Sequence, residues 1–509
     1  MTSVPNRRLP SSGSSTAFLT LVAAALLSLT SCELFKPVTT PTDRTTQRDD
    51  RAEEENLDPV QSRRVYDPET GTYVFVATAP TEVMDTVRWT AIDEERNPPI
   101  IEEGTEVYVP PTTGTELGSI APVTQVGTTP EGSRLLSGYN VEVALPFLTD
   151  LYLGSEDAVN TNSLWSLHYY SGVKMALDEM RSQGSTTYQV RVSDTQAKPG
   201  QTRQIINSPG FQNAQLVFGP YRKDNVTTMA EAVRGKETVL ISPYSAAAGI
   251  TQANPNYVQV NPTLETHLRS LIQHAYQTQR ADRIVLVTGT DPAQQARLGY
   301  IQDEYKILTG DANITPLETL QVDMNQAETT LADYLQGRKT VFIVPIYENE
   351  SFVANFLRLL YTETREDFGR NVAVYGLPQW IDFTRINFDY YEGTNVHVSS
   401  SVFIDKLNPA VRSFRRNFYE RFAVLPRDEA FVGYDVTRYF LRMAAEYGTR
   451  FQYALEANPE DLLHTRFRFQ PVAVVPANAT NFEQATLDRF ENKYVNILRF
   501  RDYGFKRVN

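Results

Sequence analysis

The sequence predicts an α/β protein in which parallel sheets are covered by helices on both faces. From Tyr139 onward, short apolar runs rich in Val and Ile recur, and segments of helical length separate them. Most of these runs end at Gly, Pro, Ser or Asp. Short strands that alternate with helices are typical of parallel sheets wrapped by helices. In such sheets a ligand binds outside the carboxyl ends of the strands, so binding is the first activity we expect.

The expected elements follow in chain order. A helix is predicted at Leu164–Met180, because apolar residues recur there at helical spacing until Gly184 ends the pattern. Strands are expected where β-branched and apolar residues form short runs bounded by turn residues. These strands are Val141–Phe147, Tyr188–Val192, Leu216–Pro220, Val239–Pro243, Ile284–Thr288, Val341–Pro345 and Val372–Gly376.

The N-terminus has the features of a secretory signal. Arg7 and Arg8 precede an apolar run at 17–27, which is shorter than the ~20 residues that a transmembrane helix needs. Leu29-Thr30-Ser31-Cys32 follows and resembles the lipobox of bacterial lipoproteins. This resemblance implies that residues 1–31 are removed and that Cys32 is lipidated. An uncleaved anchor helix is the alternative, and in both cases the rest of the chain lies outside the cytoplasm.

The residue after Cys32 bears on which membrane holds the anchor. It is Glu33 rather than Asp, and in the sorting rule of Gram-negative lipoproteins this favours the outer membrane over the inner membrane. We therefore expect a lipid-anchored protein of the periplasm, attached to the membrane through Cys32.

Composition excludes several classes of function. Cys32 is the only cysteine, so disulfides, thiol catalysis and Cys-ligated metal sites are excluded. The five histidines are scattered without metal-binding spacing, and no cofactor or metal is expected. The net charge of −13 argues against nucleic acid. Nucleophile-elbow, P-loop and dinucleotide-binding motifs are absent, and the Ser171–Lys174 match to Ser-x-x-Lys lacks its companion motifs, so no enzyme is expected.

Residues 32–138 have the composition of a tether. Pro, Thr and dense charge dominate, and such a sequence does not bury enough apolar surface to fold. A small β-ribbon is expected at 66–90, from a turn and strand at Tyr66–Val76 and an extended stretch at Val83–Trp89. The ribbon either docks on a cell-envelope partner by adding to its sheet edge, or folds back on its own domain or stays loose.

The order of the elements from Tyr139 to the end resembles the type I periplasmic binding proteins, the branched-chain amino acid receptors (Leu/Ile/Val-binding type) in particular. The segments that carry the resemblance are Leu145–Phe147, Tyr170–Glu179, Asp194, Phe218–Pro220, Leu240–Ser245 and Gly433–Asp435. The resemblance implies two lobes joined by a three-strand hinge. The crossings are expected near Asn261, near Ser400 and around Leu462. Lobe 1 would then hold about 139–261 and 401–462, and lobe 2 about 262–400 and 463–509.

The resemblance also implies where a ligand would bind, and the matching positions depart from the pattern. Arg222 and Lys223 stand where a small hydroxyl residue is expected, Ser245 is kept, and Ala246 replaces a Thr. Ala246 cannot hydrogen-bond a carboxylate, which would be costly to bury unpaired. In the second lobe the usual acidic residue is missing, and Gln379 and Trp380 lie nearby. A free branched-chain amino acid is therefore not expected.

Another ligand remains compatible with these positions. Arg222 and Lys223 suit an anionic group, or they form a solvated loop with Asp224. Tyr347, Trp380 and Tyr434 suit stacking on a sugar or peptide, or they pack in the core and anchor helices. Asp194 is expected to accept hydrogen bonds from loop backbone donors.

Two functions are carried forward. The first is a substrate-binding or receptor lipoprotein of the amino-acid ABC transporter type, which binds a small polar solute in an interlobe cleft. The second is a ligand-free adaptor or activator of an outer-membrane or peptidoglycan-synthesis complex, which uses the same fold as a protein-binding surface. Outer-membrane lipoprotein activators of peptidoglycan synthases resemble this plan, and a long tether suits reach across the periplasm.

Overall fold

The structure is a computed structural model. It describes residues 127–152, 159–184, 186–322, 331–335, 339–365, 371–474 and 486–509, together with the two strands of a ribbon near the N-terminus. Cys32, the signal segment and the stretch Val83–Trp89 lie outside the described residues.

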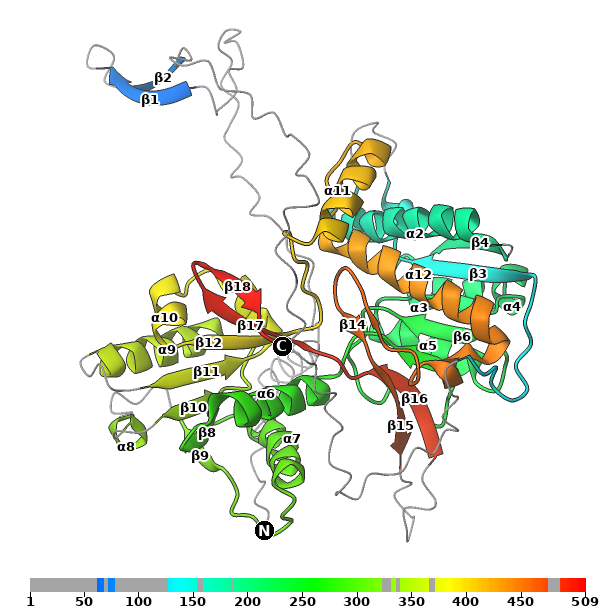
Figure 1. The fold of residues 1–509 in the computed structure, drawn as a ribbon. Helices are drawn as coiled ribbons and strands as arrows, with labels where there is room; N and C mark the ends of the chain where they lie inside the picture. The colour runs from blue at the N-terminus through cyan, green and yellow to red at the C-terminus, as the bar shows by residue number, and fades with distance from the viewer. Residues whose placement is uncertain are drawn as a thin grey trace, which may run out of the picture. The chain divides into compact units, whose positions relative to one another are not determined.

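The first lobe is built on a seven-stranded sheet with the order β15-β16-β7-β6-β5-β3-β4 (Figure 1). The five strands from β7 to β4 are parallel, β16 runs parallel to β7, and only β15 is antiparallel to its neighbour. The strands are β3 (Gly138–Leu145), β4 (Thr187–Asp194), β5 (Leu216–Phe218), β6 (Val239–Ser242), β7 (Tyr257–Gln259), β15 (Phe469–Val474) and β16 (Thr486–Asn492).

Helices cover both faces of this sheet. The long helices α2 and α12 enclose a core with Val141 and Val143 on one face, and shorter helices bury Ala144 and Val217 on the other. The helices of this lobe are α2 (Leu164–Gln183), α3 (Pro199–Ile206), α4 (Pro209–Gln212), α5 (Lys223–Val233), α11 (Pro409–Phe422) and α12 (Asp428–Tyr447). Its short elements are η2 (Thr149–Leu151), η3 (Thr161–Ser163), η5 (Gly448–Ala454), β13 (Glu460–Asp461) and β14 (Arg466–Phe467).

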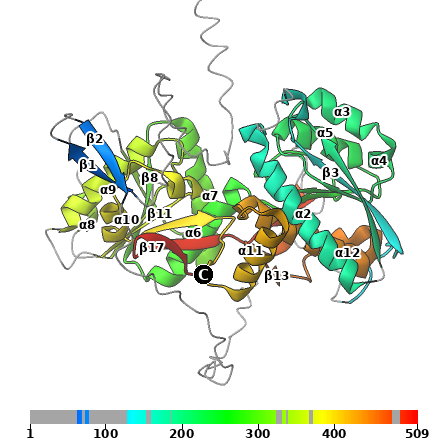
Figure 2. The same cartoon turned by 90° about the horizontal axis from the view of Figure 1, so that it is seen from above.

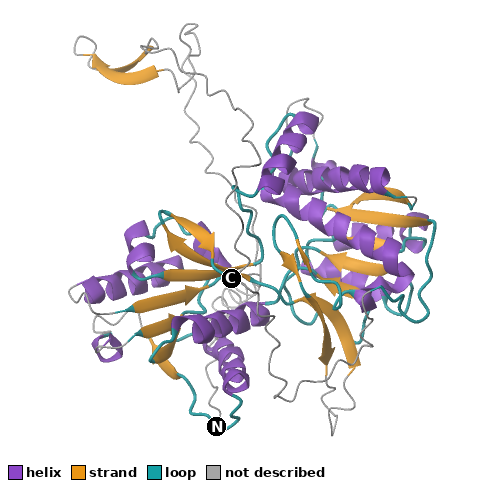
Figure 3. Cartoon of the chain, in the orientation of Figure 1, coloured by secondary structure: helices purple, strands orange, loops and turns teal. Residues whose placement is uncertain are grey.

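The second lobe repeats the plan on a sheet with the order β18-β17-β12-β11-β10-β8-β9. Its strands are β8 (Arg283–Thr288), β9 (Glu318–Gln321), β10 (Thr340–Ile343), β11 (Val372–Gly376), β12 (Val396–Ser400), β17 (Asn496–Arg501) and β18 (Gly504–Arg507). Its helices are α6 (Leu264–Gln279), α7 (Pro292–Thr309), α8 (Ala332–Leu335), α9 (Glu350–Arg365), η4 (Pro378–Asp382) and α10 (Phe388–Gly393). Helices α6 and α7 pack on one face, and α8, α9 and α10 on the other (Figure 3).

The predicted fold class, two helix-covered sheets in two lobes, is confirmed by this strand order. Along the chain, the backbone passes between the sheets after β7, after β12 and between β16 and β17. The expected third crossing around Leu462 is wrong, because β15 and β16 still belong to the first sheet. Of the segment 463–509 that was assigned to lobe 2, only β17 and β18 join the second sheet.

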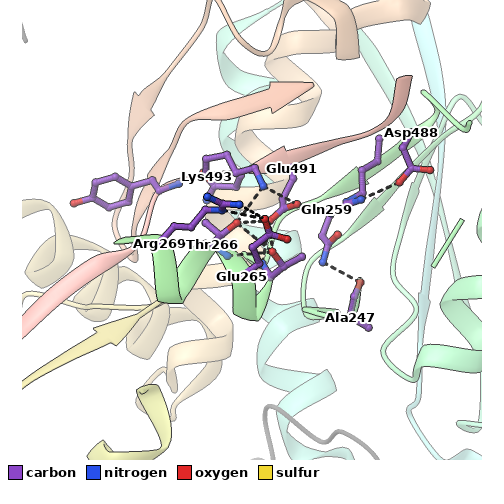
Figure 4. A network of polar contacts seen from close by, with 12 residues as sticks. Ala247, Gln259, Glu265, Thr266, Arg269, Asp488, Glu491 and Lys493 are labelled. Carbon is purple, nitrogen blue, oxygen red and sulfur yellow. Dashed lines mark hydrogen bonds and ion pairs between the residues drawn. The ribbon is translucent and has the colours of Figure 1, made fainter. Parts of the chain in front are cut away.

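A buried ionic cluster joins the first and third crossings (Figure 4). The Glu491 carboxylate is fully buried and accepts hydrogen bonds from the backbone N–H and hydroxyl of Thr263 and from the hydroxyl of Thr266. It also pairs with Arg489 at 2.6 Å and with Lys493 at 3.0 Å. Since Thr263 caps the N-terminus of α6, the positive end of the helix dipole faces the carboxylate. These partners lower the pKa of Glu491 to about 2, against the opposing effect of burial.

The ribbon near the N-terminus differs from the expected one. Its strands are β1 (Ser62–Asp67) and β2 (Thr72–Ala77), paired antiparallel with Asp67 opposite Thr72. The strand that pairs with β1 is therefore β2, which the sequence places in the turn and strand at Tyr66–Val76.

Two glycines set the separation of α2 and α12, which lie against each other in both views (Figure 1, Figure 2). A Cβ atom on Gly172 would lie 2.0 Å from the Ala430 carbonyl oxygen, and one on Gly433 would lie 2.1 Å from the Tyr169 carbonyl oxygen. Any larger side chain would force the two backbones apart.

We therefore expect Gly433→Ala to lower the free energy of unfolding by about 2 kcal/mol, because the two helices must separate. Urea unfolding measures this loss. The matched control is Gly299→Ala, in a helix where a Cβ atom has no neighbour within 4 Å, and this change is expected to be neutral or stabilising. Equal losses for both variants would contradict the role of the close helix contact.

Within the described residues, no helix is both long and apolar enough to cross a membrane.

Candidate functional site

Four aromatic side chains meet at the carboxyl-terminal ends of the first-lobe strands, and we call them the aromatic cluster: Trp165, Tyr169, Tyr221 and Tyr244. Trp165 and Tyr169 belong to α2, Tyr221 follows β5, and Tyr244 follows β6. The ring centroid of Trp165 lies 5.0 Å from that of Tyr221 and 5.2 Å from that of Tyr244. Tyr169 and Tyr244 are 5.7 Å apart. The rings are tilted or perpendicular to one another, which is the preferred geometry for aromatic contact.

The loop that carries Tyr221 is placed by a glycine. Gly219 has φ +105°, and a Cβ atom there would lie 2.1 Å from the Ala144 carbonyl oxygen. Only glycine combines this backbone conformation with such a close approach to β3. The loop therefore folds tightly over the end of the sheet and directs Tyr221 into the aromatic cluster.

The aromatic cluster combines apolar faces with hydroxyl groups. The Tyr169 and Tyr244 hydroxyls are buried, and the structure gives neither a hydrogen-bond partner. Burial raises the pKa of Tyr244 well above its usual value, and Glu429 and Asp428, at the start of α12, add to this effect. Both hydroxyls are therefore neutral at physiological pH and available as donors to a ligand or water.

Asp194 shapes the neighbouring loop, as predicted. Its carboxylate accepts hydrogen bonds from the backbone N–H groups of Phe147, Leu148, Thr149 and Gln196. These bonds lower the pKa of Asp194 although burial opposes them. The residue organises the loop after β3, which precedes the helix that carries Trp165.

The predicted ligand-binding residues of the first lobe divide into two groups. Ser245 and Ala246 are buried in the loop next to Tyr244, so they adjoin the aromatic cluster. Arg222 and Lys223 are exposed at the start of α5, immediately after Tyr221. Asp224 is also exposed, and within the described residues neither cation forms an ion pair with it.

The predicted residues of the second lobe are held within that lobe. Trp380 is fully buried in the core, and its indole N–H donates to the Ile346 carbonyl at 2.7 Å. The Tyr347 ring is covered by the Arg297 guanidinium at 4.5 Å. Gln379 lies partly buried beside Trp380 in η4. Trp380 thus offers no open ring face for stacking. It packs in the core, as one of the two interpretations of the sequence expected.

Tyr434 lies away from these loops. Its hydroxyl donates to the Glu179 carboxylate of α2, and its ring packs on Phe414 of α11 at 4.9 Å. The neighbouring Asp435 is buried and accepts hydrogen bonds from the backbone and ring of His464. Tyr434 therefore joins three helices, as in the anchoring alternative, and does not line the end of the sheet.

The structure brings together only part of the predicted set. Ser245, Ala246 and the loop with Arg222 and Lys223 lie around the aromatic cluster, whereas Trp380 and Tyr434 serve packing. Sequence reasoning assigned no ligand role to Trp165, Tyr221 or Tyr244. A signal was present, because Tyr221 and Tyr244 directly follow two neighbouring parallel strands, whose ends must converge.

A cavity of about 50 Å³ lies beside this region at the hinge. It is lined by Pro243, Tyr244, Val260, Asn261, Ser401, Val402, Val432, His464 and Thr465. The Asn261 side-chain oxygen is buried and has no hydrogen-bond partner among the described residues. This volume accommodates water but no amino acid. No group of three His, Cys, Asp or Glu side chains suited to a metal ion occurs in the described parts of the chain.

Comparisons with known proteins return structural likenesses only. No family model and no curated protein matches the sequence. A putative branched-chain amino acid ABC transporter protein from Rhodospirillum rubrum is 14% identical, with TM-score 0.49, over 72% of this chain and 99% of the other.

Two further solved structures are similar over comparable lengths. A substrate-binding protein from Desulfitobacterium hafniense in complex with Leu is 14% identical, with TM-score 0.44, over 73% of this chain and 100% of the other. LpoA from Haemophilus influenzae is 13% identical, with TM-score 0.47, over 74% of this chain and 60% of the other. At these identities and TM-scores, no site residue is carried across from any of them.

Proposed function

We propose that this chain is an extracytoplasmic binding protein that takes up a small polar solute at the carboxyl-terminal ends of its first-lobe strands. Attachment to a membrane through Cys32, with the outer membrane favoured, forms part of the proposal. The solute differs from a free branched-chain amino acid, because Ala246 supplies no hydroxyl to hold a carboxylate.

The aromatic cluster is the observation that carries this proposal. Tyr221 and Tyr244 are partly exposed and pack on the buried Trp165, and they lie at the place where parallel sheets bind ligands. Arg222 and Lys223 stand exposed on the adjoining loop and add positive charge. This combination suits a molecule with a flat or ring-shaped face and an anionic group, such as a sugar acid.

Native mass spectrometry of the full chain, purified without denaturation, tests the proposal. We expect an added mass that leaves on mild unfolding, and about tenfold weaker retention in Tyr244→Ala, which removes one ring of the surface. The matched control is Tyr419→Ala, since Tyr419 is exposed on α11. A bare protein mass, or equal retention by both variants, would contradict solute binding at the aromatic cluster.

A second candidate is a ligand-free adaptor of a cell-envelope complex. The observation in its favour is the close contact within the aromatic cluster, whose rings already occupy the space between them. The hinge cavity of about 50 Å³ is too small for a solute. A bare protein mass together with capture of a cell-envelope protein would favour this candidate.

A further inference from the structure

A large groove lies at the amino-terminal ends of the first-lobe strands, opposite the aromatic cluster. Its volume is about 1500 Å³. Its walls include Asn140 of β3 and the residues directly before the next strands, Gln215, Thr238 and Asn256. The groove is therefore separate from the solute site proposed above.

The groove carries positive charge in an acidic protein. Four basic side chains line it, Arg191, Arg234, Lys236 and Arg450, against one acidic side chain, Glu237. Glu237 is itself paired with Arg134. The whole chain has a net charge of −13, so this surface is opposite in sign to the protein's overall charge.

Two of these cations make no ion pair with any described residue. The Lys236 ammonium group lies 3.4 Å from the Gln212 side-chain oxygen. Arg450 donates to the Glu131 carbonyl at 2.9 Å, and its guanidinium lies 4.9 Å from the centre of the Tyr453 ring. Hydrogen bonds to neutral oxygens leave both positive charges uncompensated, so an incoming carboxylate gains a charge-assisted hydrogen bond.

An open sheet edge borders the groove. Strand β4 is the last strand in its sheet, and among the described residues only β3 pairs with it. Gln189 and Arg191 of β4 are exposed and line the groove, and Val192 is exposed beside them. An eight-residue edge strand with four exposed residues and without proline or lysine is a template for strand addition.

We propose that this groove binds an acidic, extended segment of a partner protein. The segment pairs with the edge of β4, and its carboxylates meet Lys236 and Arg450 where it crosses the amino-terminal ends of the strands. A peptide is favoured over a nucleic acid because the sheet edge offers main-chain hydrogen bonds that a phosphate backbone cannot reciprocate. This inference goes beyond solute binding and does not depend on it.

Fluorescence anisotropy with a labelled dodecapeptide of alternating Val and Glu tests the proposal on the full chain. We expect saturable binding that weakens as salt rises, because the charges involved are exposed. The double variant Lys236→Glu/Arg450→Glu is expected to weaken binding about tenfold or more. The matched control is Arg358→Glu/Arg416→Glu, which reverses two exposed cations on α9 and α11.

Two further probes separate strand addition from attraction between charges. An alternating Val-Lys dodecapeptide is expected not to bind. Two versions of the Val-Glu peptide are N-methylated on alternate amides, one along each edge of the strand. Only the version methylated along the edge that faces β4 is expected to lose affinity. Equal binding of the Val-Lys peptide, or unchanged affinity in Lys236→Glu/Arg450→Glu, would overturn the proposal. Full affinity of both N-methylated peptides, one methylated along each edge, would overturn pairing with β4.

Discussion

Glu491→Gln is expected to lower the free energy of unfolding by about 3 kcal/mol, because it leaves buried cations without their counter-charge. Arg489 is 9% exposed and pairs with both Glu491 and Asp488. Glutamine keeps the shape of the side chain and one oxygen for the Thr263 and Thr266 donors, so the loss reports the charge. Urea unfolding followed by tryptophan fluorescence measures it.

The matched control is Glu265→Gln, at the start of the same helix α6. Glu265 is 41% exposed and pairs with Arg269 across one helical turn, so its loss is expected to cost about 0.5 kcal/mol or less. A loss of stability for Glu491→Gln no larger than that of the control would contradict the expectation that the buried charge of Glu491 stabilises the fold.

Acidification from pH 7 to 4.5 is expected to destabilise the second lobe through three histidines. Burial lowers the pKa of His267 and of His274 to about 4 and that of His397 to about 3. His267 is fully buried, and neither ring nitrogen has a hydrogen-bond partner among the described residues. His397 stacks on Tyr375 at 4.6 Å, and its ring Nδ1 lies 2.9 Å from the Asn395 carbonyl oxygen.

The sign follows from proton binding. Below the unfolded-state pKa of about 6.5, these histidines are protonated in the unfolded chain but stay neutral in the folded chain. The free energy of unfolding therefore falls as the pH drops towards the folded-state pKa. Each histidine contributes at most about 1.4 kcal/mol per pH unit within this window. Glu491 acts only at lower pH, since its stabilising charge is lost between the unfolded pKa of about 4.3 and its folded value of about 2.

Urea unfolding of wild type and His267→Leu at several pH values between 7 and 4.5 tests this expectation. Leucine fills the apolar site without titrating, so the slope of stability against pH should fall by about 1 kcal/mol per pH unit. His168 is only half-buried, and burial together with Arg427 lowers its pKa as well, so His168→Gln is the comparison and is expected to reduce the slope less than His267→Leu. Identical slopes for wild type and His267→Leu would contradict neutral burial of His267.

The fold was predictable where apolar patterning was strong, and the error at the third crossing has a physical cause. The strands from Val141 to Gly376 read as short Val- and Ile-rich runs, and all of them lie in sheets. Strand β16 contains Asp488, Arg489 and Glu491, which look like a solvated segment. The structure buries all three because Arg489 forms ion pairs with both carboxylates. The spacing of apolar residues along a sequence gives no sign of such ion pairs.

The candidate site was predictable in place but not in chemistry. The loops after β5 and β6 were expected to meet, and they do so at Tyr221 and Tyr244. For Trp380 and Tyr434 the sequence left stacking and packing open, and the structure favours packing through partners from distant segments, the Ile346 carbonyl and the Glu179 carboxylate. Whether a ring faces a core or a ligand depends on tertiary contacts that one sequence does not display.

The late position of the crossing between β16 and β17 has a consequence for biogenesis. The first sheet takes β15 and β16, and the second takes β17 and β18, from residues 469–507. A chain that emerges from a ribosome or a translocon N-terminus first therefore cannot complete either sheet until residues 469–507 have emerged. Until then the β7 and β12 edges stay unpaired, and a truncation that removes residues 469–507 is expected to disrupt both sheets together.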